Sequence, residues 1–344
     1  VISRLSEETG ARHGTAFDSE LDEQTFTLRA GKTFNGGKTN ISLSAEYSRR
    51  DGLFASEKFY SASEDLTPLA VGTSFEGDAS LDNRATQTPW GQFTLRTTTA
   101  TRVRRNGAIL TTPAGVFHIQ PTTSAGCLGG TANLLSVPGI CIDDGTQEAA
   151  LRYDGATERS IISDRDRYNA FAFLNHDLDN GVRLYSELGF YRAKTISTNE
   201  PRNGIGGTEI SVPANYYYNP FGPVTFSDGS PNPNRLTGLT NVPAQGLPVF
   251  TDAGRYRFVD VGFRDIEVLN TQWRALIGAR GEIFDSGWDW DSAMLYNRAS
   301  ARDFENNSVS RTLFQQALNN ETPNVYNIFN GGDQSNPSIG DGTP

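Results

Sequence analysis

Six stretches of the chain alternate between apolar and polar residues, which is the pattern of a strand with one apolar face and one polar face. In residues 288–298 the apolar set is Trp288, Trp290, Met294 and Tyr296, and the polar set is Asp289, Asp291 and Asn297. The stretches pair into hairpins over about residues 24–50, 166–194 and 268–302. Their turns contain Asn, Asp and Gly, which accept the positive φ angles of tight hairpins.

The connections at the opposite ends of these hairpins are long. About residues 51–165, 195–267 and 303–344 show no sustained period and are rich in Gly, Pro, Asn, Ser and Thr. Connections in compact soluble domains have a median of about 4 to 6 residues, whereas outer-membrane barrels combine short periplasmic turns with long extracellular loops. We expect the last of the three loops to be incomplete, because the sequence given ends within it at Pro344.

The apolar stripes are about 9 to 11 residues long, which is the length that a tilted strand needs to cross a bilayer. A soluble β-sandwich or solenoid would alternate equally well, but the long loops at one end and the aromatic residues at the stripe ends favour a membrane. We therefore predict an all-β fold, an antiparallel transmembrane β-barrel segment with long extracellular loops. The side chains expected to face lipid or form an aromatic girdle are Phe34, Tyr47, Phe190, Trp273, Trp288, Trp290 and Tyr296.

The composition provides few hydrophobic residues for a large hydrophobic core. Only 36% of the residues are hydrophobic, 35 are Gly, and the formal net charge is -10; the mean hydropathy is -0.46. The negative charge argues against nucleic acid as a partner. No apolar run is long enough for a transmembrane helix. The chain opens without Met or a signal peptide, so we expect it to be a piece of a longer protein.

Two cysteines, Cys127 and Cys141, lie in a Gly-rich stretch without periodicity. This pattern predicts a loop disulfide in an oxidising compartment, and closing a loop of this size stabilises by about 3 kcal/mol in the chain-entropy model. Two free thiols are the alternative. The three histidines are scattered and no catalytic motif is present, so the sequence predicts neither an enzyme nor a metal site or cofactor.

Two loop stretches, residues 212–226 and 322–332, concentrate aromatic residues. Such side chains could stack on a ligand or anchor an interface; alternatively, they pack the loops on each other. The residues are Tyr216, Tyr217, Tyr218, Phe221, Tyr326 and Phe329.

The segments AEYSRRDGLFASEKFYSASEDL, YNPFG, NHDLDNGVRLYSELGFY, GEIFDSGWDWDSAMLYNR and TPNVYNIFNGG together resemble the barrel region of TonB-dependent outer-membrane receptors of Gram-negative bacteria. The resemblance implies a 22-stranded barrel that is occluded by a plug domain. Such a receptor imports a scarce, bulky extracellular nutrient, such as a siderophore, cobalamin or an oligosaccharide, with energy passed through TonB. This chain would supply about six to eight strands, in contact with outer-membrane lipid.

The same resemblance implies that polar-parity residues contact the plug or line the passage. They are Arg29, Glu46, Arg183, Glu187, Arg274, Arg280 and Glu282. The resemblance also implies that the plug and the TonB-contacting segment lie upstream of Val1, outside the sequence given. A passive porin or adhesion barrel without a plug shares every strand feature, and a secreted β-rich binding protein is a further alternative.

Overall fold

The computed structural model describes residues 5–15, 22–121, 140–143, 151–207, 209–251, 255–284 and 286–331. These residues form an all-β fold with antiparallel sheets, and α1 (Arg311–Ala317) is the one α-helix among them. The chain divides into two compact units. The long-sheet unit comprises Val1–Lys58, Ser160–Thr198 and Asp265–Asn306, and the loop unit comprises Phe59–Arg159, Asn199–Arg264 and Asn307–Pro344.

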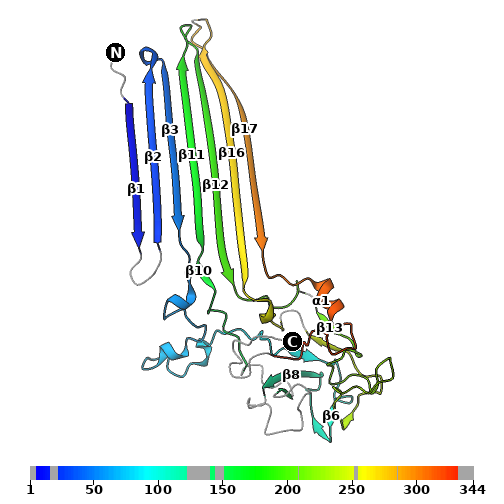
Figure 1. The fold of residues 1–344 in the computed structure, drawn as a ribbon. Coiled ribbons are helices and arrows are strands. Elements are labelled where there is room, and N and C mark those ends of the chain that lie inside the picture. Colours follow the sequence, from blue (N-terminus) through cyan, green and yellow to red (C-terminus); the bar gives the residue numbers. More distant parts are fainter. Residues whose placement is uncertain are drawn as a thin grey trace. The chain divides into compact units, whose positions relative to one another are not determined.

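The long-sheet unit is built on one sheet of seven strands (Figure 1). In spatial order they are β1 (Leu5–Thr15), β2 (Asp22–Phe34), β3 (Thr39–Arg50), β11 (Asp164–Asp177), β12 (Arg183–Asn199), β16 (Arg264–Glu282) and β17 (Asp289–Glu305). Six of these strands are the predicted ones, and β1 is the additional strand that the N-terminal residues supply. Among the described residues β1 and β17 are the edges, so the sheet is open.

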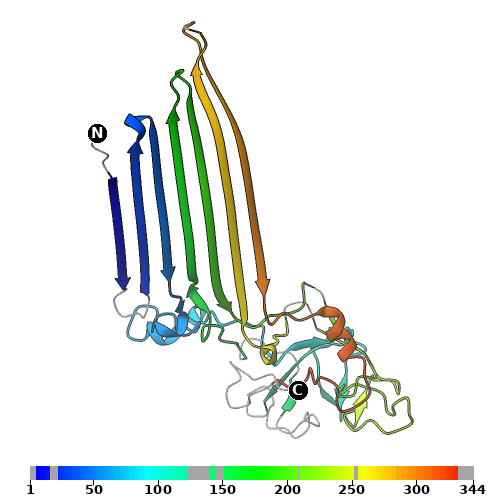
Figure 2. The same cartoon turned by 45° about the horizontal axis from the view of Figure 1, so that its top comes forward.

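The turns of the three predicted hairpins lie at one end of the sheet (Figure 2). In the first turn Asn35, Gly36 and Gly37 have φ angles of 56°, 65° and 97°, which is the left-handed region where Gly and Asn carry little steric cost. Gly181 has a φ of 82° in the second turn. The short turns therefore depend on the residue types that the sequence places there.

A small sheet of β4 (Leu53–Phe54) and β10 (Ser160–Ile162) adjoins the long strands. The loop unit holds two further sheets. One has the order β13 (Ile210–Val212), β15 (Val249–Thr251), β5 (Gln92–Thr94), β8 (Val116–Pro121) and β9 (Ile140–Asp143), and the other β14 (Leu239–Thr240), β6 (Arg104–Arg105) and β7 (Ala108–Ile109). The 3-10 turns are η1 (Asn35–Gly37), η2 (Ala55–Glu57), η3 (Thr67–Ala70), η4 (Ala79–Leu81) and η7 (Val259–Val261).

The loop unit has a hydrophobic core of its own. Trp90, Phe93, Phe117, Tyr256 and Phe258 are nearly or completely buried within it. The segments expected to be loops without regular structure therefore fold together around aromatic side chains. No helix in the described ranges is long and apolar enough to cross a membrane.

Candidate functional site: the two faces of the long sheet

Strand register sorts the side chains of the long sheet onto two faces, because directly opposed residues of an antiparallel pair share a face. Phe26 is opposite Tyr47, and Tyr47 is opposite Tyr168. Glu46, one position along β3, is opposite Thr27 and Asn169. One face is thus continuously apolar near its middle, and the other is polar.

The polar face carries all the residues predicted to line a passage. Two ion pairs link neighbouring strands across its middle: Arg167 Nη2 lies 2.8 Å from Glu46 Oε1, and Arg274 Nη2 lies 3.3 Å from Glu187 Oε2. These side chains are about one-third to two-fifths exposed, so each pair contributes roughly 0–1 kcal/mol. They set side-chain orientation more than stability. Arg29, also on this face, is opposite Ser44.

The remaining three predicted residues gather at the turn end of the polar face. Arg183, Arg280 and Glu282 line a hollow of about 520 Å³ together with Asp177, Asp289 and Asp291. Arg183 pairs with Asp177, and the Tyr185 hydroxyl donates to Asp291. The hollow therefore mixes both charge signs and suits polar contacts with solvent or protein. Among the described residues no group of three or more side chains could hold a metal ion.

Phe171 and Phe173 interrupt the polar face. In the sequence, residues 170–174 are all apolar, so the alternation does not show which face the two phenylalanines occupy. The register places Phe171 opposite Ser44 and Gly189, on the polar face. A Cβ at Gly189 would lie 3.2 Å from the Phe171 ring, so the glycine makes room for it. The two rings stack with centroids 6.4 Å apart and are about 40% exposed. The polar face thus includes an aromatic contact that sequence reasoning did not assign.

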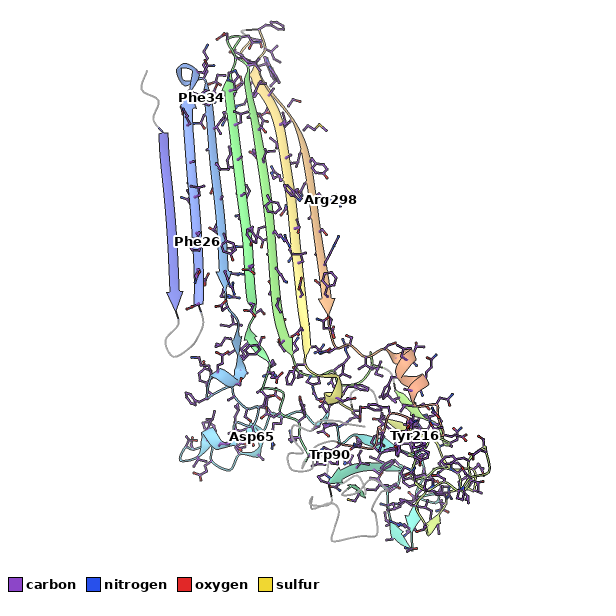
Figure 3. The ribbon with its side chains drawn as sticks, in the orientation of Figure 1. Phe26, Phe34, Asp65, Trp90, Tyr216 and Arg298 are labelled. Carbon is purple, nitrogen blue, oxygen red and sulfur yellow. The ribbon has the colours of Figure 1, made fainter. Side chains whose placement is uncertain are left out.

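The apolar face carries two rows of aromatic rings. One row lies nearer the loop end in β2, β3 and β11 and at mid-strand in β12, β16 and β17. Its ring centroids lie 6.4 Å apart for Phe26 and Tyr47, 4.9 Å for Tyr47 and Tyr168, and 4.4 Å for Phe190 and Trp273. Tyr296 continues this row on β17. At the turn end lie Phe34, Trp288 and Trp290; Figure 3 shows Phe34 at the turn end of β2 and Phe26 farther along the same strand toward the loops. The predicted girdle residues therefore form two rows on one face.

The row near the loop end runs obliquely to the strand register. Tyr168 is opposite Arg192, but the aromatic residue on β12 is Phe190, two positions closer to the turns. Trp273 is opposite Arg298, and the aromatic residue on β17 is Tyr296, again two positions closer. The turns shift in the same direction from β2–β3 to β16–β17 (Figure 2).

Half of the aromatic residues predicted to bind ligand are core residues of the loop unit. Tyr216 and Phe221 are completely buried and Phe329 is 1% exposed, so these three favour the alternative in which the loops pack on each other. The Tyr216 hydroxyl donates to the Tyr326 carbonyl and accepts from the Ile328 N–H at 3.1 Å. The other three, Tyr217, Tyr218 and Tyr326, pack against this core and are partly exposed.

Burial shifts the titration of several groups in the loop unit. It raises the pKa of Tyr153 to about 12 and also raises the pKa of Tyr256 and Tyr326, whose hydroxyl oxygens are 2.8 Å apart. Burial raises the pKa of the Asp260 carboxyl, which is hydrogen-bonded to Tyr326. These phenols stay neutral at physiological pH and act as fixed hydrogen-bonding groups. Cys141 is completely buried and disulfide-bonded, whereas Cys127 lies outside the described residues.

Residues 59–75 expose large apolar side chains that the sequence analysis did not single out. The exposed fractions are 81% for Phe59, 55% for Tyr60, 46% for Leu69, 68% for Val71 and 62% for Phe75. Their sequence signal is a group of large apolar residues in an otherwise polar stretch without periodicity. Exposed apolar groups of this kind suit contact with a ligand or another protein surface.

A charged network holds this segment to residues 151–159. Arg84 Nε lies 2.9 Å from Asp82 Oδ1 and its Nη2 lies 3.6 Å from Asp65 Oδ2. Arg152 reaches the same Asp82 carboxylate at 3.5 Å. The hydrogen bond from Arg84 lowers the pKa of Asp82, so this carboxylate remains charged in mildly acidic solution.

Comparison of the chain with protein-family models, curated proteins and solved structures found no match.

Proposed function

We propose that the long sheet is part of the wall of a transmembrane β-barrel in the outer membrane of a Gram-negative bacterium. The barrel would belong to a TonB-dependent receptor that imports a bulky nutrient such as a siderophore, cobalamin or an oligosaccharide. The observation that carries the membrane proposal is the apolar face bounded by two rows of aromatic rings.

The separation of the two rows matches a bilayer. Phe26 and Phe34 on β2 are eight positions apart, as are Trp288 and Tyr296 at the other side of the sheet. At a rise of about 3.4 Å per residue, eight positions span about 27 Å along the strand. The apolar band of outer-membrane barrels is about 25 Å tall and is flanked by aromatic girdles.

Exposure of the apolar face disfavours a secreted, water-soluble protein. Leu188 is 52% exposed, Ile277 67% and Met294 79%. Soluble monomers rarely expose contiguous apolar patches larger than a few hundred Å², and this face extends over several neighbouring strands. Lipid is the solvent that makes such exposure favourable, because transferring each large apolar side chain out of water contributes about 1.5–3 kcal/mol.

The transport role rests on the polar face, the loop unit and the family resemblance of the sequence. A charged inner wall with the Phe171 and Phe173 rings provides contacts for a plug domain, and the exposed apolar side chains of residues 59–75 provide a surface for capturing a ligand. A passive porin would need neither a plug contact nor a capture surface.

Two measurements test this proposal. Cell fractionation places the full-length protein in the outer membrane if the apolar face meets lipid, and recovery in the soluble fraction would refute the barrel. Ligand uptake then separates transporter from pore: a receptor accumulates its ligand only while the inner membrane is energised. Uptake that persists unchanged after collapse of the proton gradient would leave a passive barrel.

A further inference from the structure

The apolar face has two neighbouring hollows beside the aromatic row at its loop end. The first, of about 570 Å³, lies among Phe26, Leu28, Tyr47, Tyr168 and Phe190. The second, of about 370 Å³, lies among Leu43, Leu188, Phe190, Trp273 and Tyr296. Phe190 contributes to both.

Small side chains line parts of both hollows and leave room between the larger ones. Ala45 lines the first hollow, Ala172 and Ala275 line the second, and Ala170 lines both. Ala45 and Ala170 are directly opposite each other on β3 and β11. Together with the aromatic rings and leucines around them, they make the lining of each hollow mainly apolar, and each hollow is called a groove below.

An arginine lies just beyond each groove, on the same face. Arg192 is directly opposite Tyr168, and Arg298 is directly opposite Trp273; Figure 3 shows Arg298 on β17. Both side chains are exposed. Among the described residues neither has an ion-pair or hydrogen-bond partner, whereas the nearby cations Arg49 and Lys194 are paired with Asp51 and Glu267.

Two unpaired guanidinium groups beside apolar grooves are complementary to an anionic amphiphile. Guanidinium binds phosphate through two parallel hydrogen bonds, and a position beyond the aromatic row corresponds to head-group depth. Arg192 and Arg298 are separated by two strand spacings, or about 10 Å across the sheet. One compact phosphate cannot contact both, so the arrangement fits a head group with phosphates at separate positions.

We propose that this face binds an anionic lipid with several acyl chains and at least two phosphate groups, as a bound lipid of the outer leaflet. The acyl chains occupy the two grooves, and the phosphates pair with Arg192 and Arg298. This inference rests on the proposed insertion of the sheet into the outer membrane.

The test uses the full-length protein in phosphatidylcholine nanodiscs and lipid A, a diphosphorylated and multiply acylated disaccharide, as the probe. Bound lipid A is counted by native mass spectrometry over a concentration series. We expect the Arg192→Gln/Arg298→Gln variant to bind at least tenfold more weakly than the wild type. The matched control, Arg29→Gln/Arg280→Gln, removes the same charge from the polar face and should bind like the wild type.

Ala170→Leu supplies an independent variant, because it fills both grooves without changing charge; it should also weaken binding. An unchanged affinity in the Arg192→Gln/Arg298→Gln variant, or an equal loss in the control, would overturn the inference. Equal binding of monophosphorylated phosphatidylglycerol would overturn the requirement for two phosphates. Protein that enters nanodiscs but does not bind lipid A refutes this inference alone, whereas protein that never enters them refutes the proposed function.

Discussion

Leu174 and Asn175 offer a matched pair for testing which face meets lipid. They are adjacent on β11, so their depth is nearly equal, but Leu174 is opposite Ile41 on the apolar face and Asn175 is opposite Asn40 on the polar face. Leu174 is 40% exposed and lies between Tyr168 and Leu178, close to the middle of the apolar band. An arginine at the midplane of the lipid face costs about 2–4 kcal/mol, falling to about 0–1 kcal/mol near the interfaces.

We therefore expect Leu174→Arg to lower the free energy of unfolding by about 2–4 kcal/mol in lipid vesicles, a change of roughly 30- to 700-fold in the folding equilibrium. Asn175→Arg should change it by less than about 1 kcal/mol, because its side chain stays in water. Urea titration of the full-length protein in vesicles, followed by tryptophan fluorescence, measures both. Equal costs for the two variants, or a larger cost for Asn175→Arg, would refute the face assignment.

Three further predictions concern packing, acid sensitivity and the loop core. A Cβ at Gly278 would lie 2.3 Å from the Tyr185 ring. Gly278→Ala should therefore lower the free energy of unfolding by about 1–3 kcal/mol in the same urea titration. Adding Tyr185→Ser to this variant should restore the lost stability. The pKa of Asp82 is lower in the folded protein than its ordinary value of 3.8. The ion pair of Asp82 therefore stabilises the folded loop unit at pH values above 3.8, and this stabilisation is lost as the pH falls through the pKa of the folded state. Pepsin cleavage within residues 59–82 should accelerate only below that ordinary value, whereas Arg84→Gln should already show faster cleavage by a neutral protease. Tyr216→Phe removes the hydroxyl that is hydrogen-bonded to the Tyr326 carbonyl and the Ile328 N–H. The loss should lower the free energy of unfolding by about 1–3 kcal/mol and lower the thermal unfolding midpoint. An unchanged midpoint would contradict the role given to that hydroxyl.

The long strands could be predicted because their apolar residues repeat every second position over many residues. The shorter strands of the loop unit could not, because β5 and β13 have three residues each, too few to display a period. Burial of Tyr216 and Phe221 depends on contacts between segments about 100 residues apart, such as the hydrogen bond from Tyr216 to Tyr326. A local pattern carries no such information, so the same aromatic sequence is compatible with a ligand surface and with a core.

The polar face shows a different limit of sequence reasoning. Parity alone placed Arg274 and Glu187 on equivalent faces, but their 3.3 Å contact depends on the register between neighbouring strands. Phe171 and Phe173 were ambiguous because both parities of β11 are apolar there. Only the pairing with β3 and β12 decides that their rings share a face with Ser44 and Glu187.

The oblique course of the aromatic row determines how the sheet would stand in a bilayer. The row shifts by four positions between β2 and β17, about 13 Å along the strands over five strand spacings of about 24 Å in total. If that row marks the membrane surface, the strands are inclined by about 30° to the bilayer normal, close to the tilt of known barrels. Directly opposed residues on neighbouring strands then lie at different depths in the bilayer. Because the strands are inclined, each strand takes up about 5.5 Å of the barrel circumference, compared with about 4.8 Å for strands parallel to the bilayer normal. If the proposed barrel has 22 strands, these seven would make up about a third of its perimeter, and they would curve as a broad arc around a wide lumen.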